Sequence, residues 1–220
     1  GNQVQTSTTT GNQISKWAVQ WDEPGDFTPN RVALDSQGNV HVVDFLGFNV
    51  QVFNATGQFV TRWDAEAPDP DDLVAPFAIA IDAADIVYVL CNGRELQTFT
   101  TTGSPRGTIQ LEAGVDGAAF ALHDNGEIVL LSSESNTVSR YSASGALIKT
   151  WGGPGSAEGK FNTPLGIAVD SQGAIYVADS GNDRVQKFSG SGDFLTAFGG
   201  RGSAAGQLIN PIGIAVDASG

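Results

Sequence analysis

Four aspartates recur at a regular spacing, and they are the first residues that could do chemistry. They are Asp35, Asp82, Asp170 and Asp217. A ring of carboxylates would suit a divalent cation, because hard cations prefer oxygen ligands. However, a glycine follows most of them three residues later, and Asp-x-x-Gly is typical of a turn whose amides bind the carboxylate. We therefore expect these aspartates to cap turns rather than to bind a metal.

Two glycine-rich segments resemble phosphate-binding loops, but their context argues against that role. Residues 153–159 read Gly-Pro-Gly-Ser-Ala-Glu-Gly, and residues 200–206 read Gly-Arg-Gly-Ser-Ala-Ala-Gly. A dinucleotide-binding loop occurs once, between a strand and a helix, whereas this pattern recurs. No Gly-x-Ser-x-Gly stretch marks a serine nucleophile. The sequence therefore favours neither nucleotide binding nor serine hydrolysis.

The composition excludes several classes of partner and site. The 220 residues contain 11 Lys+Arg against 24 Asp+Glu, for a net charge of −13. This acidity argues against nucleic acid as the main partner, since phosphate neutralisation needs clustered Lys and Arg. No stretch approaches the roughly 20 apolar residues of a membrane span, so we expect no membrane insertion. The single cysteine, Cys91, excludes an internal disulfide and any multi-cysteine zinc site.

An internal repeat indicates which elements must position the candidate residues. The frame Pro-Leu-Gly-Ile-Ala-Val-Asp at 164–170 returns as Pro-Ile-Gly-Ile-Ala-Val-Asp at 211–217. Weaker copies begin at Pro29 and Pro76, and a worn copy ends in His123. A glycine recurs in register at 11, 57, 103, 145 and 192. A period of roughly 40–50 residues is typical of repeat folds such as β-propellers.

Each repeat unit reads as four short strands. In the unit 159–205 the apolar, β-branched runs are 166–169, 174–178, 184–188 and 194–198, and turn residues separate them. No segment shows a sustained helical period. The prediction is an all-β protein, a β-propeller of four-stranded antiparallel blades with the first strand innermost. Fourth strands end in Trp17, Trp63 and Trp151, and we expect these side chains to pack between blades.

Residues 162–200 resemble an NHL repeat. They read NTPLGIAVDSQGAIYVADSGNDRVQKFSGSGDFLTAFGG. The motif is also clear at 29–63, and it is degraded at 76–109 and 117–151, where Cys91 and Ser132 replace an aspartate. The resemblance covers essentially the whole chain. It implies an NHL-type β-propeller, a family whose members commonly have six blades.

The repeat divides the chain into four complete blades and two partial ones, in a single domain that is incomplete at both ends. The predicted boundaries are 1–23 for the end of one blade, 24–70, 71–112, 113–158 and 159–205 for complete blades, and 206–220 for the start of another. The sequence also lacks Met. We therefore expect a longer parent chain. The repeat spacing allows five or six blades, and the resemblance favours six.

The loops between second and third strands, together with the connections between blades, are the expected binding surface. In NHL-type propellers these loops share one face, so the resemblance implies a partner-binding role for Asp179, Asp183 and Arg184. The alternative is an Asx-type turn with a local Asp–Arg pair.

Apolar substitutions in one of these loops give a second set of candidates. Phe45, Leu46 and Phe48 stand where a later copy has polar or glycine residues, and exposed apolar clusters tend to mark contact sites. The alternative is that Phe45 and Phe48 fold back onto the neighbouring blade. Trp21 breaks the period in the first connection between blades, which makes it a further interface candidate.

These observations predict a non-catalytic binding or scaffold module, which engages a protein partner or a second copy through its loop face. The alternative is a metal-dependent hydrolase or lyase with its site in the central channel, since some propellers that resemble this one work in that way. We expect no cofactor, although the acidic run 64–72 leaves calcium as an ion to consider. The Lys-poor, Ser/Thr/Gly/Asn-rich composition suggests an extracellular or cell-surface location.

Overall fold

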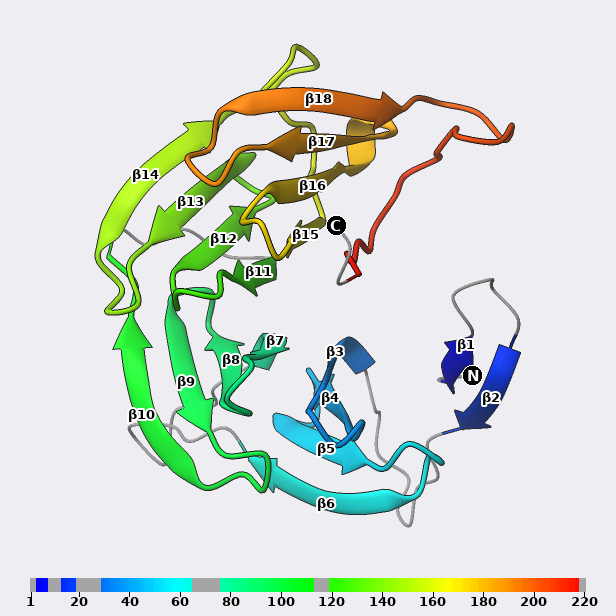
Figure 1. The fold of residues 1–220 in the computed structure, drawn as a ribbon, viewed down its shortest axis with the longest axis vertical. Helices are drawn as coiled ribbons and strands as arrows, with labels where there is room; N and C mark the ends of the chain where they lie inside the picture. Colours follow the sequence, from blue (N-terminus) through cyan, green and yellow to red (C-terminus); the bar gives the residue numbers. More distant parts are fainter. Residues whose placement is uncertain (1–2, 8–12, 19–28, 65–75, 113–118, 218–220) are drawn as a thin grey trace. The chain divides into compact units, whose positions relative to one another are not determined.

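The computed structural model describes residues 3–7, 13–18, 29–64, 76–112 and 119–217, and its regular structure is almost entirely β-strand (Figure 1). Within these ranges the only helix is a short 3₁₀ turn, Ser180–Asn182. No helix in the described part of the chain has the length and apolar character to cross a membrane. The predicted all-β class is confirmed.

Four antiparallel sheets of four strands follow one another along the chain, and each is one blade. The first blade comprises β3 (Pro29–Leu34), β4 (Val40–Asp44), β5 (Asn49–Phe53) and β6 (Phe59–Asp64). The second comprises β7 (Pro76–Ile81), β8 (Val87–Cys91), β9 (Glu95–Phe99) and β10 (Pro105–Gln110). The third comprises β11 (Ala119–Leu122), β12 (Ile128–Ser132), β13 (Thr137–Tyr141) and β14 (Leu147–Gly152). The fourth comprises β15 (Gly166–Val169), β16 (Ile175–Asp179), β17 (Arg184–Phe188) and β18 (Phe194–Gly199).

The strands within each blade lie in the order in which they occur in the chain. In the fourth blade β15 and β17 match the predicted ranges, and β16 and β18 differ from them by one residue. The propeller of four-stranded antiparallel blades is therefore confirmed as the fold class. Short alternating runs between turn residues are local signals, which is why they could be read from the sequence.

Two further segments follow the repeat without forming a full blade. Among the residues that the structure describes, β1 (Gln3–Ser7) and β2 (Gln13–Ala18) pair only with each other, as a two-stranded antiparallel sheet. Residues 211–217 carry the frame of a first strand, but they form no ladder with another strand in the described part of the chain. The predicted boundaries of the partial blades and the total number of blades stay predictions.

The regularly spaced aspartates cap the turns that follow the first strands. Asp35 Oδ1 accepts hydrogen bonds from the amides of Gln37 and Asn39, at 3.0 and 2.8 Å. Asp82 and Asp170 make the same pair of bonds to amides two and four residues later. The prediction of turn capping is confirmed for these three aspartates. The turn after the fourth aspartate lies outside the described residues.

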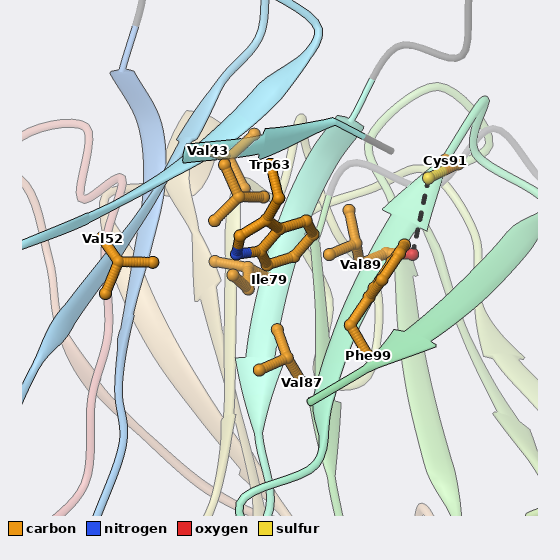
Figure 2. Close-up of a cluster of buried hydrophobic side chains, with 9 residues drawn as sticks. Val43, Val52, Trp63, Ile79, Val87, Val89, Cys91 and Phe99 are labelled. Carbon is orange, nitrogen blue, oxygen red and sulfur yellow. Dashed lines mark hydrogen bonds between the residues drawn. The ribbon is translucent and has the colours of Figure 1, made fainter. Parts of the chain in front are cut away.

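The chain forms two compact units, residues 1–91 with 97–107 and residues 92–96 with 108–220. In the first unit, Trp63 packs on the Phe99 ring of the second blade with 4.6 Å between ring centroids (Figure 2). The indole leaves no room for a Cβ at Gly103 beside it. In the second unit, Trp151 packs against Phe188 of the following blade at 6.0 Å. The predicted packing of these two tryptophans between blades is confirmed.

Candidate functional site

The turn between β4 and β5, residues 45–48, is called the first-blade tip. Two hydrogen bonds hold its backbone at Gly47. The Gly47 amide donates to Asp44 Oδ1 (3.0 Å), and the Gly47 carbonyl accepts a hydrogen bond from Asn49 Nδ2 (2.8 Å). A Cβ at position 47 would collide with both side chains. Asp44 and Asn49 are themselves buried. Two buried polar groups therefore fix the shape of the first-blade tip.

Phe45 lies against the second blade. Its ring centroid is 5.0 Å from that of Phe77, with an interplanar angle of 59°. Asn30 holds β7 at this point, because its Nδ2 donates to the carbonyl of Phe77 (2.9 Å). The alternative interpretation, in which Phe45 packs on the neighbouring blade, is confirmed for this residue.

Leu46 and Phe48 differ from Phe45 in their surroundings. Leu46 is 51% exposed. Phe48 is half-buried and has a φ of +53°. The left-handed region is costly for a bulky residue. Such strain persists only where the surrounding structure enforces it, and it clusters at binding and switch sites. The first-blade tip thus combines an exposed apolar side chain with a strained neighbour.

The position of Phe48 has a structural role in two other blades. Asn136 and Asp183 stand at the same place in their turns, with φ of +57° and +56°. Asn136 Oδ1 accepts the amide of Thr163 (2.7 Å), and Asp183 Oδ1 accepts the amide of Asn210 (2.8 Å). Each bond ties a turn to the segment that enters the next repeat. A phenylalanine side chain has no acceptor, so the first-blade tip keeps the backbone conformation without a side chain that could make this bond.

Asp179, Asp183 and Arg184 lie together in the turn between β16 and β17, in the other unit. Asp179 is fully buried. Its Oδ2 accepts hydrogen bonds from Arg184 Nε (2.7 Å), Asn182 Nδ2 (2.9 Å) and Gln186 Nε2 (3.0 Å). The local Asp–Arg pair that was the alternative interpretation is therefore present, within a larger network.

This network fastens the turn to the connection between the third and fourth blades. Arg184 Nη2 donates hydrogen bonds to the carbonyls of Ala157 and Lys160, at 2.8 and 2.9 Å. Asp179 Oδ1 accepts the amide of Asn162 (2.8 Å). Within this unit, the loop between second and third strands thus meets the loop between blades, as the resemblance implied. A partner-binding role for Asp179, Asp183 and Arg184 stays a prediction.

Three residues beside the first-blade tip were missed by the sequence analysis: Asn30, Arg31 and Phe77. Arg31 donates to the carbonyl of Asn30 (3.2 Å), and burial lowers the pKa of Arg31. Arg31 stands where the fourth blade has Gly166, so this departure from the repeat could have marked it. Phe77 gave no such signal, because Leu165 occupies the same place in the fourth blade.

The two histidines occupy structural positions of the repeat. His41 is fully buried, with Nε2 3.3 Å from Asp35 Oδ2. Tyr88 and Tyr176 take the same place in the second and fourth blades, and each hydroxyl donates to the corresponding aspartate. Burial lowers the pKa of His41 and of His123. Among the described residues, no group of three or more His, Cys, Asp or Glu side chains is arranged to hold a metal ion.

Two predicted features fall outside the described residues. They are Trp21 and residues 65–72 of the acidic run. A contact role for the first and calcium binding by the second stay predictions.

A family model described as the NHL repeat matches residues 161–188. These residues are an NHL repeat. They hold β15, β16 and β17, including the turn with Asp179 and Arg184. The predicted resemblance is confirmed, at the copy in which the motif is clearest. No curated protein sequence matches the chain.

Solved structures with the same fold include a streptogramin B lyase and virginiamycin B lyases. A streptogramin B lyase aligns with a TM-score of 0.64 and 18% identity, over 89% of this chain and 61% of that chain. A selenomethionine-substituted virginiamycin B lyase from Staphylococcus aureus aligns with a TM-score of 0.59 and 21% identity, over 80% of this chain and 56% of that chain. A catalytically inactive histidine-to-alanine variant of the S. aureus enzyme, with quinupristin, aligns with a TM-score of 0.66 and 16% identity, over 95% of this chain and 72% of that chain.

These alignments bear on the fold and not on the chemistry. The chain spans 61% and 56% of the length of the first two lyases, with 18% and 21% identity. Fold similarity at this level does not carry function, because one fold serves many activities. The comparison therefore supports the propeller fold of the chain.

Proposed function

We propose that this chain is a non-catalytic NHL-type propeller module, which binds a protein partner through the first-blade tip. One observation carries the proposal: Leu46 is 51% exposed next to Phe48, which holds a left-handed conformation. In the third and fourth blades an Asn or Asp at the Phe48 position accepts an amide. The first blade has exchanged that polar acceptor for apolar surface.

The chemistry of the surroundings supports a protein as the partner. Protein interfaces combine an apolar core, in which a few residues carry most of the binding energy, with a polar rim. Leu46 supplies an anchor, and the Phe45–Phe77 pair supports the turn from which it projects. Asn30 donates to the carbonyl of Phe77, and Arg31 donates to Asn30, so these two residues supply polar groups.

The test replaces the anchor and a matched control. Leu46→Ser removes the exposed leucine, and Val60→Ser removes a side chain of the same unit that is 53% exposed on β6. Each protein is used as bait in chemical cross-linking with the proteins of its source, and its self-association is followed by sedimentation velocity. The proposal expects a partner, or a second copy, that is retained by wild type and Val60→Ser and reduced at least tenfold by Leu46→Ser. Equal recovery by all three proteins would contradict it.

A second candidate function is a lyase with a site in the propeller channel. It is a candidate by analogy of fold alone, because the structures that share the fold include streptogramin B and virginiamycin B lyases, at TM-scores of 0.59 to 0.66. The purified chain would be incubated with quinupristin and divalent cations, and the products followed by mass spectrometry. Turnover would favour the lyase over the binding module. An intact substrate would leave the binding module as the better account.

We also propose an extracellular or cell-surface location. The support is compositional: 11 Lys+Arg against 24 Asp+Glu, with 28 Gly. Fractionation of the source cells with an antibody against the chain tests this, since recovery from the cytosol alone would contradict it.

A further inference from the structure

One modification motif lies outside the proposed function: the triplet Asn54-Ala55-Thr56. It is the only Asn-x-Ser/Thr sequence in the 220 residues, and its middle residue is not proline. This pattern is the acceptor for N-linked glycosylation in secreted proteins, where it marks a surface loop. Such a triplet also arises by chance, so its exposure and hydrogen bonds decide what it is worth.

The triplet lies in the turn between β5 and β6, at the surface of the first blade. Ala55 and Thr56 are exposed, and Asn54 is half-buried. Residues 142–144 form the same turn in the third blade and show the same burial, half-buried, exposed and exposed. There the end of the preceding fourth strand lies against the next residue, Gly145. The exposure of this turn therefore does not require that the neighbouring blade be absent.

The asparagine side chain holds the turn through its oxygen and leaves its nitrogen largely unused. Asn54 Oδ1 accepts hydrogen bonds from the Thr56 amide (3.0 Å), the Thr56 hydroxyl (2.7 Å) and the Gln58 amide (2.9 Å). Asn54 Nδ2 donates to Oε1 of the exposed Gln58 (3.0 Å). An amide nitrogen carries two hydrogens, and a glycan on Nδ2 replaces one of them. All three hydrogen bonds to Oδ1 can therefore remain in the modified turn.

The other blades cap the same turn without an asparagine. In the third and fourth blades a serine hydroxyl, of Ser142 or Ser189, accepts the amide four residues later, at 3.1 Å in each. Thr100 does the same in the second blade, at 3.0 Å. A hydroxyl group is thus sufficient for the capping bond. Among the four described blades, only the first places an amide nitrogen at this position.

We propose that Asn54 carries an N-linked glycan. The donor is an oligosaccharide linked to a polyprenyl diphosphate, and the catalyst is an oligosaccharyltransferase of the secretory route. Asn54 Nδ2 forms a bond to the anomeric carbon of the first sugar while the bond from that carbon to the diphosphate breaks. The diphosphate leaves with the electron pair, and Nδ2 loses one proton. This inference rests on the proposed extracellular or cell-surface location and is independent of the first-blade tip.

A glycan at this turn is compatible with partner binding at the first-blade tip. β5 runs from the tip to the turn, so Phe48 and Asn54 lie beyond its opposite ends. Six residue steps at about 3.4 Å each separate them by roughly 20 Å. The bulky, solubilising sugar therefore stands at one end of the blade, and Leu46 is exposed at the other.

The native protein gives the first test. The chain is isolated from the secreted or cell-surface fraction of its source, digested with trypsin, and treated with peptide-N-glycosidase in water enriched in oxygen-18. Removal of a glycan converts Asn54 to aspartate and adds one oxygen-18, which tandem mass spectrometry locates in the peptide 32–62 between two arginine cleavage sites. We expect this label at Asn54. Its absence would overturn the inference and leave the proposed location standing, whereas recovery of the chain from the cytosol alone would overturn both.

Variants separate the modification from the structural role of the turn. Ala55→Pro keeps Asn54 and Thr56 but places proline where the acceptor pattern excludes it. Proline is favoured at the second position of a β-turn, and the Gly57 amide closes this turn on the Asn54 carbonyl (2.9 Å). Asn54→Ser introduces the residue that the third and fourth blades use, and Thr56→Ser keeps the acceptor pattern.

Each protein is produced with a secretory leader in eukaryotic cells, and its electrophoretic mobility is compared before and after glycosidase treatment. We expect a glycan on wild type and Thr56→Ser, and none on Ala55→Pro or Asn54→Ser. After deglycosylation, the melting temperatures of the variants should match that of wild type. An unmodified wild type, or a glycan that persists in Ala55→Pro or Asn54→Ser, would overturn the assignment of Asn54 as the site.

Discussion

Arg184 Nε donates to Asp179 Oδ2 across 2.7 Å, and the Asp179 side chain has no exposed surface. Removing one partner of a buried ion pair leaves the other uncompensated, which typically costs about 3–5 kcal/mol. Because Arg184 keeps 17% of its side-chain surface exposed, we expect Asp179→Ala to lower the free energy of unfolding by about 3 kcal/mol, near the low end of that range. Urea denaturation followed by fluorescence measures the change.

The exposed pair Lys149–Asp193 is the control for this prediction. Its side chains are 41% and 71% exposed, and surface pairs contribute about 0–1 kcal/mol. Asp193→Ala should therefore change the free energy of unfolding far less than Asp179→Ala does. Equal losses in the two variants would contradict a structural role for the Asp179 network.

His41 should make stability depend on pH. Burial lowers its pKa in the folded chain, and its Nδ1 is buried without a hydrogen-bond partner. The unfolded chain therefore takes up the proton first, so stability is full above the ordinary histidine pKa of about 6.5 and falls as the pH drops through that value. Tyr88 and Tyr176 occupy the same position in other blades, so His41→Tyr is a natural replacement.

Urea denaturation between pH 8 and pH 5 checks this prediction. Wild type should lose stability over that interval, and His41→Tyr should lose less. Part of the slope should remain, because burial also lowers the pKa of His123. An unchanged slope in His41→Tyr would rule out His41 as its source.

Asp85 links the first two blades through its carboxylate, and its own backbone is strained. Its φ is +59°, and its carboxylate accepts hydrogen bonds from the Ser36 amide (2.9 Å) and hydroxyl (2.6 Å). Asp85→Ala should lose the bonds and keep the strain, whereas Asp85→Gly should lose the bonds and relieve it. A left-handed residue costs about 1–2 kcal/mol, so the glycine variant should be the more stable by about 1 kcal/mol. Thermal and urea unfolding of the two variants decide this, and an alanine variant that is at least as stable would contradict it.

Gly192 should tolerate substitution less well than Gly159. Both have positive φ, +80° and +73°, but a Cβ at Gly192 meets the Trp151 ring whereas nothing lies within 4 Å of one at Gly159. The shared conformational cost cancels in the comparison. Gly192→Ala should therefore be less stable than Gly159→Ala by about 1–3 kcal/mol, the usual cost of overpacking. Identical unfolding midpoints would show that the indole moves aside.

Local patterns account for what the sequence predicted well. Strand alternation and the Asp-x-x-Gly turns depend on neighbours a few residues apart, so β15, β17 and the capping by Asp35 could be read directly. The burial of Asp179 could not, because its carboxylate is satisfied partly by the amide of Asn162, which precedes it by 17 residues and leads into the blade.

The sequence predicted the unusual composition of the first-blade tip but not its contacts with the next blade. The apolar identity of residues 45–48 is visible in the sequence, and it marked the turn as unusual. The contact between Phe45 and Phe77 joins two blades, and the role of the Phe48 position emerges only when Asn136 and Asp183 are seen to accept amides. Such long-range contacts leave no mark in a single repeat.

Leu46 is proposed to contact a protein partner, and site-specific photo-cross-linking tests this contact. A benzophenone amino acid would be placed at position 46 and, in a second protein, at position 60, since both native side chains are about half exposed. Each protein would be irradiated with the proteins of its source, and adducts would be identified by mass spectrometry. If Leu46 contacts the partner, one dominant protein adduct forms from position 46 and is absent from position 60. The same adducts from both positions, or none from position 46, would contradict it.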